Sequence, residues 1–120
     1  MPAPLSISER IIGDVVMLEL RGRLVFDEGD RELRERVTSL AQAGSRQMLV
    51  GLKDVSYIDS GGVGALVEMF LHVTRRGGRF KLLCPSPCAH RVLDITHLRT
   101  VFEIFGDEPT ALASFDQVPA

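Results

Sequence analysis

Hydrophobic and polar side chains alternate along residues 15–24, where the sequence reads VVMLELRGRL. A period of two predicts a β-strand with one buried face. The preceding residues 5–12 predict a second strand, with Gly13 and Asp14 as the turn of a hairpin. The residues expected on the buried face of the longer strand are Val16, Leu18, Leu20 and Leu24.

From Glu28 to Ala43 the apolar spacing changes to that of an amphipathic helix. Its apolar stripe consists of Leu33, Val37, Leu40 and Ala41. Asp27 or Asp30 is expected to cap the start of this helix, and Gly44 stands where a helix-ending glycine belongs. Residues 47–52, QMLVGL, are almost continuously apolar and predict a central strand covered on both faces.

The second half of the chain continues the alternation of strands and helices. Residues 79–84 predict a strand, and Ser86 followed by Pro87 marks the start of a helix. Residues 101–105 predict a last strand, after which Asp107 caps a short terminal helix. The resulting order, β-β-α-β-α-β-α-β-α, indicates an α/β fold with a mixed or mainly parallel sheet.

Length and composition fit one globular domain. The chain has 120 residues, of which 45% are hydrophobic and 25% charged. Its formal net charge of −2 provides no basic surface for nucleic acid. The amino-terminal residues resemble no signal peptide and no apolar run approaches the length of a membrane helix, so we expect a cytoplasmic protein without direct membrane insertion.

Two cysteines, Cys84 and Cys88, lie close to His90 in the sequence CPSPCAH. A reducing compartment argues against a disulfide between them. Structural zinc normally takes four ligands, and the chain offers no second Cys/His pair. We therefore expect two thiols beside a turn and no metal site.

The stretch YIDSGGVGAL, Tyr57 to Leu66, joins the central strand to a helical pattern and carries three glycines within four residues. The helical pattern places six mostly apolar residues on one side and six residues with small or polar side chains on the opposite side. The apolar set is Val63, Leu66, Val67, Phe70, Val73 and Thr74. The opposite set is Gly61, Gly64, Ala65, Glu68, His72 and Arg75.

Two enzyme-like interpretations of this junction fit poorly. A dinucleotide fingerprint would need a glycine at Val67, and no P-loop Lys-Ser or Lys-Thr follows the glycines, so no cofactor is expected. A nucleophile elbow would need a glycine at Ile58. The histidines that could serve Ser60 as a base are His72, His90 and His97, of which His72 lies three turns down the same helix.

Two further interpretations remain open from the residues alone. Ser60 is a possible phosphoacceptor, because a phosphate at a helix start changes the charge seen by any docked partner. Alternatively, Ser60 only caps the helix and the glycines only permit close packing of strand and helix.

The segment from Lys53 to Phe70, KDVSYIDSGGVGALVEMF, resembles the signature of STAS domains, and specifically of bacterial anti-sigma factor antagonists. Further landmarks follow in the expected order: GRL at 22–24, RRGGRFKLL at 75–83 and VFEIF at 101–105. The resemblance extends from about residue 5 to residue 115, so it implies a single STAS domain over residues 1–120. It implies a mixed, mainly parallel sheet with helices packed mostly on one face.

The resemblance also implies a function in partner switching. An unphosphorylated antagonist of this family binds an anti-sigma factor that is also a serine-protein kinase, and phosphorylation releases the complex until a serine phosphatase resets it. In this chain the phosphoacceptor is Ser60, and Asp59 holds the junction or engages the kinase. The expected partner-binding residues are Asp59, Ser60, Gly61, Gly62, Gly64, Ala65 and Glu68, with Met69 and Leu71 at the margins.

Two positions depart from the family pattern. Gly61 stands where the motif has a second hydroxyl residue, and Val25 stands where many antagonists have an aspartate after GRL, with Asp27 out of register. Some STAS domains are phosphate-insensitive interaction subunits of sensory or transport-associated complexes. That function is the alternative to an antagonist, and neither makes the chain an enzyme.

Overall fold

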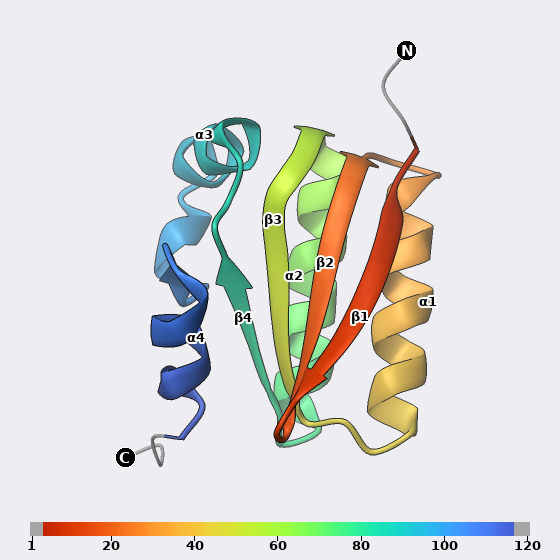
Figure 1. Ribbon diagram of the computed structural model, residues 1–120. Helices are drawn as coiled ribbons and strands as arrows, with labels where there is room; N and C mark the ends of the chain where they lie inside the picture. The colour runs from red at the N-terminus through yellow and green to blue at the C-terminus, as the bar shows by residue number, and fades with distance from the viewer. Residues whose placement is uncertain (1–3, 117–120) are drawn as a thin grey trace.

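A five-stranded sheet forms the centre of the computed structural model, which describes residues 4–116 (Figure 1). The strands lie side by side in chain order, β1-β2-β3-β4-β5. β1 and β2 are antiparallel, whereas the three other neighbouring pairs are parallel. The strands are β1 Ser6–Ile12, β2 Val15–Leu24, β3 Gln47–Ile58, β4 Arg79–Leu83 and β5 Ile104–Phe105.

The helices are distributed unequally over the two faces of the sheet. α1 and α2 lie side by side behind the sheet in Figure 1, and α3 contributes to the same hydrophobic core, whereas α4 covers part of the opposite face. The helices are α1 Gly29–Gln42, α2 Ser60–Arg75, α3 Pro87–Ile95 and α4 Glu108–Ser114, with a 3₁₀ turn at Leu98–Thr100. The predicted α/β class, element order and placement of helices mostly on one face are confirmed.

Burial along β2 differs from the one-sided pattern predicted for it. Leu18, Leu20 and Leu24 point into the main core as expected, but Val15 and Met17 on the other face are also buried. They pack in the second cluster that α4 completes through Ala111 and Phe115. The predicted burial of β3 on both faces is confirmed, with Leu49 in this second cluster.

The start of α1 was predicted incorrectly. Neither Asp27 nor Asp30 is its N-cap: Glu28 holds that position without a side-chain cap hydrogen bond. Asp27 adopts a left-handed conformation with φ 61°, which Asp tolerates better than most residues. Asp30 lies inside the first turn, where its carboxylate accepts the N–H groups of Glu28 at 3.0 Å and Arg31 at 2.8 Å.

The other predicted helix boundaries agree with the structure. Gly44 follows α1 with φ 104°, the conformation that favours glycine at a helix end. Ser86 Oγ accepts the N–H of Ala89 at 3.1 Å, and Asp107 Oδ1 accepts the N–H of Thr110 at 2.9 Å. These caps fix where α3 and α4 begin.

β5 is shorter than the predicted strand at 101–105. Only Ile104 and Phe105 pair with β4 in the described structure. Phe102 instead turns into the core, where its ring meets that of Phe70 edge-on at a centroid distance of 5.3 Å. Burial of this aromatic ring therefore replaces the first part of the expected strand.

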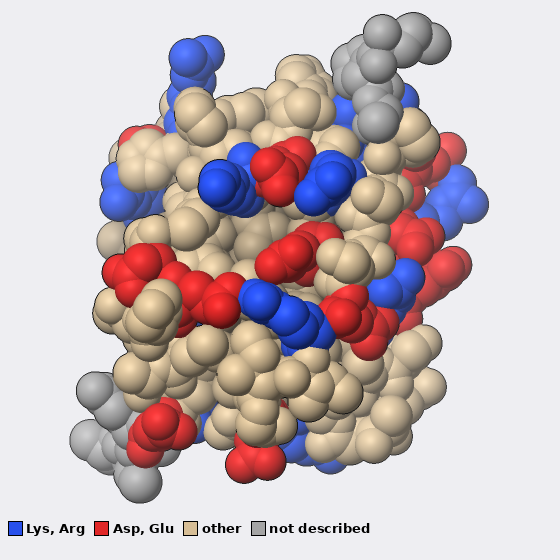
Figure 2. Space-filling view, in the orientation of Figure 1, with Lys and Arg blue, Asp and Glu red and all other residues tan. Residues whose placement is uncertain are grey.

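The sheet face opposite α1 and α2 carries charges of both signs (Figure 2). Arg10 pairs with Glu19 at 3.5 Å, and Arg21 pairs with Asp54 at 3.7 Å. Arg10 also bonds Glu108 at the start of α4. Exposed pairs of this kind contribute little stability, but they leave no uniformly basic or acidic field on this face.

Candidate functional site

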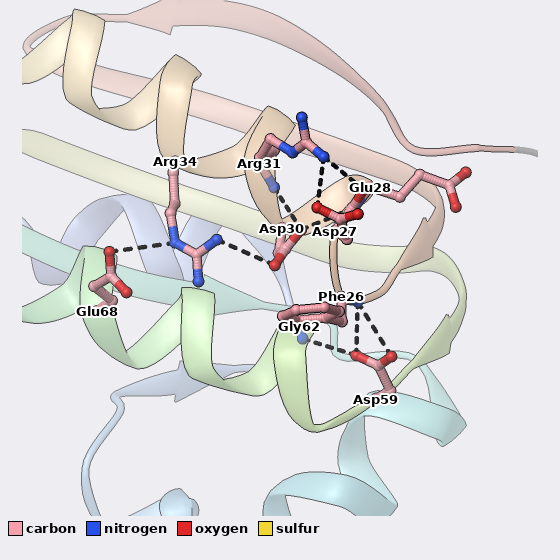
Figure 3. A network of polar contacts seen from close by, with 9 residues as sticks. All are labelled: Phe26, Asp27, Glu28, Asp30, Arg31, Arg34, Asp59, Gly62 and Glu68. Carbon is pink, nitrogen blue, oxygen red and sulfur yellow. Dashed lines mark hydrogen bonds and ion pairs between the residues drawn. The ribbon is translucent and has the colours of Figure 1, made fainter.

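A single carboxylate organises the junction between β3 and α2 (Figure 3). Asp59 lies between the strand and the helix in an extended conformation, and its Oδ1 accepts the N–H of Gly62 at 2.9 Å. Both carboxylate oxygens also accept the backbone N–H of Phe26, each at 3.1 Å. Asp59 thus ties the start of α2 to the loop after β2. The N-cap of α2 is Asp59 and not Ser60, so the interpretation of Ser60 as the cap is wrong.

The three glycines of the motif have different surroundings. A Cβ added to Gly62 would lie 2.0 Å from the carbonyl oxygen of Leu24, and one added to Gly61 would lie 2.5 Å from Cβ of Phe26. A Cβ on Gly64 would meet nothing within 4 Å. Gly61 and Gly62 therefore permit the close approach of the β2 end and the following loop, whereas Gly64 leaves a smooth patch exposed to solvent.

Two predicted partner-binding residues are inaccessible. Ala65 is 0% exposed and Gly62 is buried, so the prediction is wrong for both. Gly62 lies against the backbone of Leu24. Ala65 belongs to the main core on the side of α2 along which α1 packs, as the contact of 3.9 Å between Thr38 Oγ1 and Met69 Sδ shows. Met69, which was expected at the margin of the surface, is buried by the same packing.

The other predicted residues retain contact with solvent. Ser60, Gly64 and Glu68 are exposed, whereas Asp59 and Gly61 are half-buried. Ser60 is the first residue of α2, so its side chain lies at the accessible start of the helix. The accessible part of the predicted surface is therefore a short strip along the first turns of α2.

Arg34 connects this strip to α1 (Figure 3). Its Nη1 lies 3.1 Å from Asp30 Oδ2, and its Nε lies 3.2 Å from Glu68 Oε2. Sequence reasoning did not identify Arg34, although its spacing of four residues from Asp30 was a usable signal. Glu68 is thus paired within the chain, and a partner that contacts it competes with Arg34.

The carboxyl group of Asp30 is only 2% exposed. Burial acts to raise its pKa, but hydrogen bonds at Asp27, Arg34, Glu28 and Arg31 outweigh burial and lower the pKa below its ordinary value of 3.8. The ionised form of Asp30 is therefore built into the start of α1.

The loop between β2 and α1 adds residues that the sequence did not identify as part of the site. Phe26 is 71% exposed, and its backbone lies directly over Gly61. Val25, where the resemblance leads us to expect an aspartate, is half-buried, and its carbonyl accepts the N–H of Asp30 at 3.1 Å. The signal for Phe26 was a large aromatic residue two positions after the predicted strand end at Leu24.

The histidines and cysteines lie apart from Ser60 in the contacts that they form. His90 pairs on α3, the Cys84 thiol bonds the carbonyl of Gly106, and Nε2 of His72 is buried without a hydrogen-bond partner among the described residues. Nε2 of His90 lies 3.0 Å from Arg99 Nη1 and 3.5 Å from Asp94 Oδ2. Cys84 and Cys88 are free thiols. Residues 4–116 contain no group of three or more His, Cys, Asp or Glu side chains that could hold a metal ion, and no helix in this range is long and apolar enough to span a membrane.

Comparison with known proteins assigns this geometry to a family. The model of the STAS domain matches residues 6–111. The chain is 42% identical over 72 residues to an anti-sigma-B factor antagonist of Bacillus subtilis, covering 60% of this chain and 65% of that protein, just under two thirds of its length. It is 23% identical over 104 residues to an anti-sigma F factor antagonist of Paenibacillus polymyxa, covering 87% and 89% of the two chains.

Solved structures share the fold. Unphosphorylated SpoIIAA, an anti-sigma factor antagonist, superposes with a TM-score of 0.79 at 20% identity, covering 96% of this chain and 100% of that chain. The phosphorylated form of Bacillus SpoIIAA gives a TM-score of 0.72 at 20% identity over 92% and 99% of the two chains. The same fold therefore accommodates both states in that protein.

Proposed function

Because the chain belongs to the STAS domain family, we propose that it is an anti-sigma factor antagonist that works by partner switching. In its unmodified form it binds an anti-sigma factor that is also a serine-protein kinase, and this frees a sigma factor. Phosphorylation on Ser60 releases the complex, and a serine phosphatase restores binding. The relatives named as anti-sigma factor antagonists support the class of partner.

The observation that carries the proposal is the position of Ser60. It is exposed at the first residue of α2, immediately after the motif aspartate that caps the helix. A kinase can reach such a side chain without unfolding the protein, because the residues that fix the junction are Asp59 and the glycines. The existence of phosphorylated SpoIIAA supports modification in this fold.

Phosphate at this position acts mainly on the partner. It adds roughly −1.5 to −2 charges beside the Asp59 carboxylate at the rim of the exposed strip. A partner surface that fits the unmodified strip would have to desolvate these charges. It would also have no room for the phosphate group itself. The binding surface in this proposal consists of Asp59, Ser60, Gly61, Gly64 and Glu68, without the buried Gly62 and Ala65.

The protein acts by binding and as a kinase substrate, without a catalytic step of its own. Its place of action is the cytoplasm, where sigma factors meet RNA polymerase. The chain acts as one STAS domain over residues 1–120, with its core at about residues 5–115. The alternative is a constitutive interaction subunit whose complex does not respond to phosphate.

Pull-down from the native host's lysate tests the proposal. The baits are wild type, Ser60→Ala, Ser60→Asp and a matched control, Ser39→Asp, which places the same charge on an exposed serine near the end of α1. We expect wild type, Ser60→Ala and Ser39→Asp to retain an anti-sigma factor with a kinase domain and Ser60→Asp to lose most of it, although Asp carries only about half the phosphate charge. Equal retention by all baits, with Ser60 unphosphorylated in the recovered wild type, contradicts the proposal and favours the constitutive subunit.

A further inference from the structure

Only two of the chain's aromatic side chains are exposed. The sequence contains six Phe, one Tyr and no Trp, and all seven aromatic residues lie in the described range 4–116. Phe26 is 71% exposed and Tyr57 is 53% exposed, whereas the remaining five are buried or half-buried. Both exposed rings lie at the same end of the sheet, next to the junction that carries Ser60.

The two rings do not belong to the same surface. Tyr57 precedes Ile58, whose side chain is buried in the main core between the sheet and the helices. Because neighbouring side chains of a strand point to opposite faces, Tyr57 faces away from α2. Phe26 lies over Gly61 and therefore adjoins Ser60 on the α2 side.

The position of Phe26 is fixed by its backbone and not by burial of its ring. Its N–H is held by both oxygens of Asp59 at 3.1 Å, and its Cα and Cβ would lie 2.7 and 2.5 Å from a Cβ at position 61. A side chain at Gly61 would displace the loop. The glycine that stands in place of the second motif hydroxyl is thus the residue that makes room for Phe26.

We propose that Phe26 is the aromatic anchor through which this chain binds its anti-sigma factor; this inference rests on the proposed function and names the contact that carries it. Aromatic side chains, Phe included, are enriched in the buried centre of protein–protein interfaces, where the few residues that dominate binding lie. Because the backbone of Phe26 is already held, covering the ring restricts only its two side-chain torsions.

The surroundings of the ring define the partner surface that fits it. Within residues 4–116, Asp59 forms no ion pair with Lys, Arg or His, whereas Asp27 pairs with Arg31 and Glu28 with Arg23. Asp59 is therefore a carboxylate beside Phe26 whose charge is met only by backbone N–H groups. The partner should present an apolar socket for the ring, with an Arg or Lys at its rim facing Asp59.

The same geometry explains how a phosphate at Ser60 would act. Ser60 adjoins Gly61, on which Phe26 rests, so a socket that closes over the ring also covers the side chain at position 60. A phosphate would stand between the socket and Asp59, and it would place further negative charge where a cation and an apolar wall must approach. Anchor and phosphoacceptor therefore form one surface.

The test measures binding of the purified anti-sigma factor, recovered with the wild-type bait, by isothermal titration calorimetry. We expect Phe26→Ala to raise Kd at least 30-fold and Phe26→Leu, which keeps an apolar side chain, to raise it less. The matched controls are Ile11→Ala, which truncates a 76%-exposed side chain at the opposite end of the sheet, and Tyr57→Ala on the opposite face; both should stay within threefold. The loss in Phe26→Ala should persist at 0.5 M salt, roughly the range in which charge contacts are screened within a few ångströms.

The outcomes separate the two proposals. Binding by wild type and release by Ser60→Asp, together with an unchanged Kd for Phe26→Ala, overturns the anchor and leaves the antagonist function intact. Absence of any anti-sigma factor bound to wild type overturns both. Thermal melting checks that the variants fold. If the Tm of Phe26→Ala lies well below that of wild type, Phe26→Leu and Phe26→Lys take its place, and an unchanged Kd for both overturns the anchor. A wild-type dimer that Phe26→Ala dissociates in sedimentation would also overturn it, because the ring would then bind a second copy.

Discussion

Alanine substitutions at Gly62 and Gly64 should change stability in opposite directions. The two residues lie two positions apart in the first turns of α2, and alanine favours a helix over glycine by about 1 kcal/mol in both cases. Any difference between the variants must therefore come from what the added methyl group meets. Gly64 meets open space, whereas Gly62 meets the backbone of Leu24.

The structure sets the size of the difference. At position 62 the methyl carbon would lie 2.0 Å from the Leu24 carbonyl oxygen, against 3.4 Å or more in ordinary contact, so the helix start must move by roughly 1 Å. Overpacking of this kind costs about 1–3 kcal/mol or more, and the movement also weakens the 2.9 Å bond from Gly62 to Asp59. We expect Gly62→Ala to destabilise the protein by about 2 kcal/mol and Gly64→Ala to stabilise it by about 0.5–1 kcal/mol.

Urea denaturation followed by circular dichroism measures both changes, with equal slopes confirming that the same two-state transition is compared. A chain of this size should show the difference plainly, since about 1 kcal/mol shifts Tm by roughly 3–5 °C. If Gly62→Ala is as stable as wild type, the close approach of Leu24 is not a constraint on this position. The explanation of the motif by packing would then be wrong.

Three other substitutions test separate parts of the structure. Asp59→Ala should lower the free energy of unfolding by about 1–3 kcal/mol and expose the Phe26 amide to faster hydrogen exchange, whereas Asp59→Asn keeps the cap. Equal exchange of this amide in the two variants would refute the dual role of the carboxylate. Because the pKa of Asp30 is lowered on folding, its contribution is present above about pH 4 and is lost as pH falls through the lower folded value. Asp30→Asn should therefore be less stable at pH 7 and lose less stability on acidification, and parallel pH curves for the two proteins would count against this. Lys81→Met removes the buried ammonium that lies 2.9 Å from Ser114 Oγ and 4.5 Å from the Phe115 ring. We expect the free energy of unfolding to fall by about 1–3 kcal/mol and the amides of α4 to exchange faster than those of α2. A stabilised variant would show that this contact is dispensable.

Local patterns predicted most of the fold because each element carries its own signal. The turn at Gly13, the caps at Ser86 and Asp107 and the glycine after α1 all depend on neighbouring residues, and the structure confirms them. The errors arose where contacts distant in sequence decide. Val15 and Met17 are buried because α4 packs on them from the far end of the chain.

The candidate site shows the same division. The residues alone suggested Ser60 as the cap, whereas the structure places the N-cap one position earlier, at Asp59, because its carboxylate reaches the N–H of Gly62. Ser60 as the phosphoacceptor was predicted from the motif. Ala65 was assigned to the surface because a helical wheel shows which side of α2 faces the sheet but not that α1 covers a second side. Phe26 was missed because its proximity to Gly61 depends on the path of a loop 33 residues before Asp59.

The most direct measurement of the central claim compares one protein in two chemical states. Wild-type chain and chain carrying phosphoserine at position 60, produced by site-specific incorporation, are titrated with the purified anti-sigma factor from the host. Partner switching predicts that phosphate weakens binding by about 100-fold or more, since the coupling must exceed about 2.7 kcal/mol to empty the complex at working concentrations. Equal affinity of the two states would contradict the claim that Ser60 is the switch.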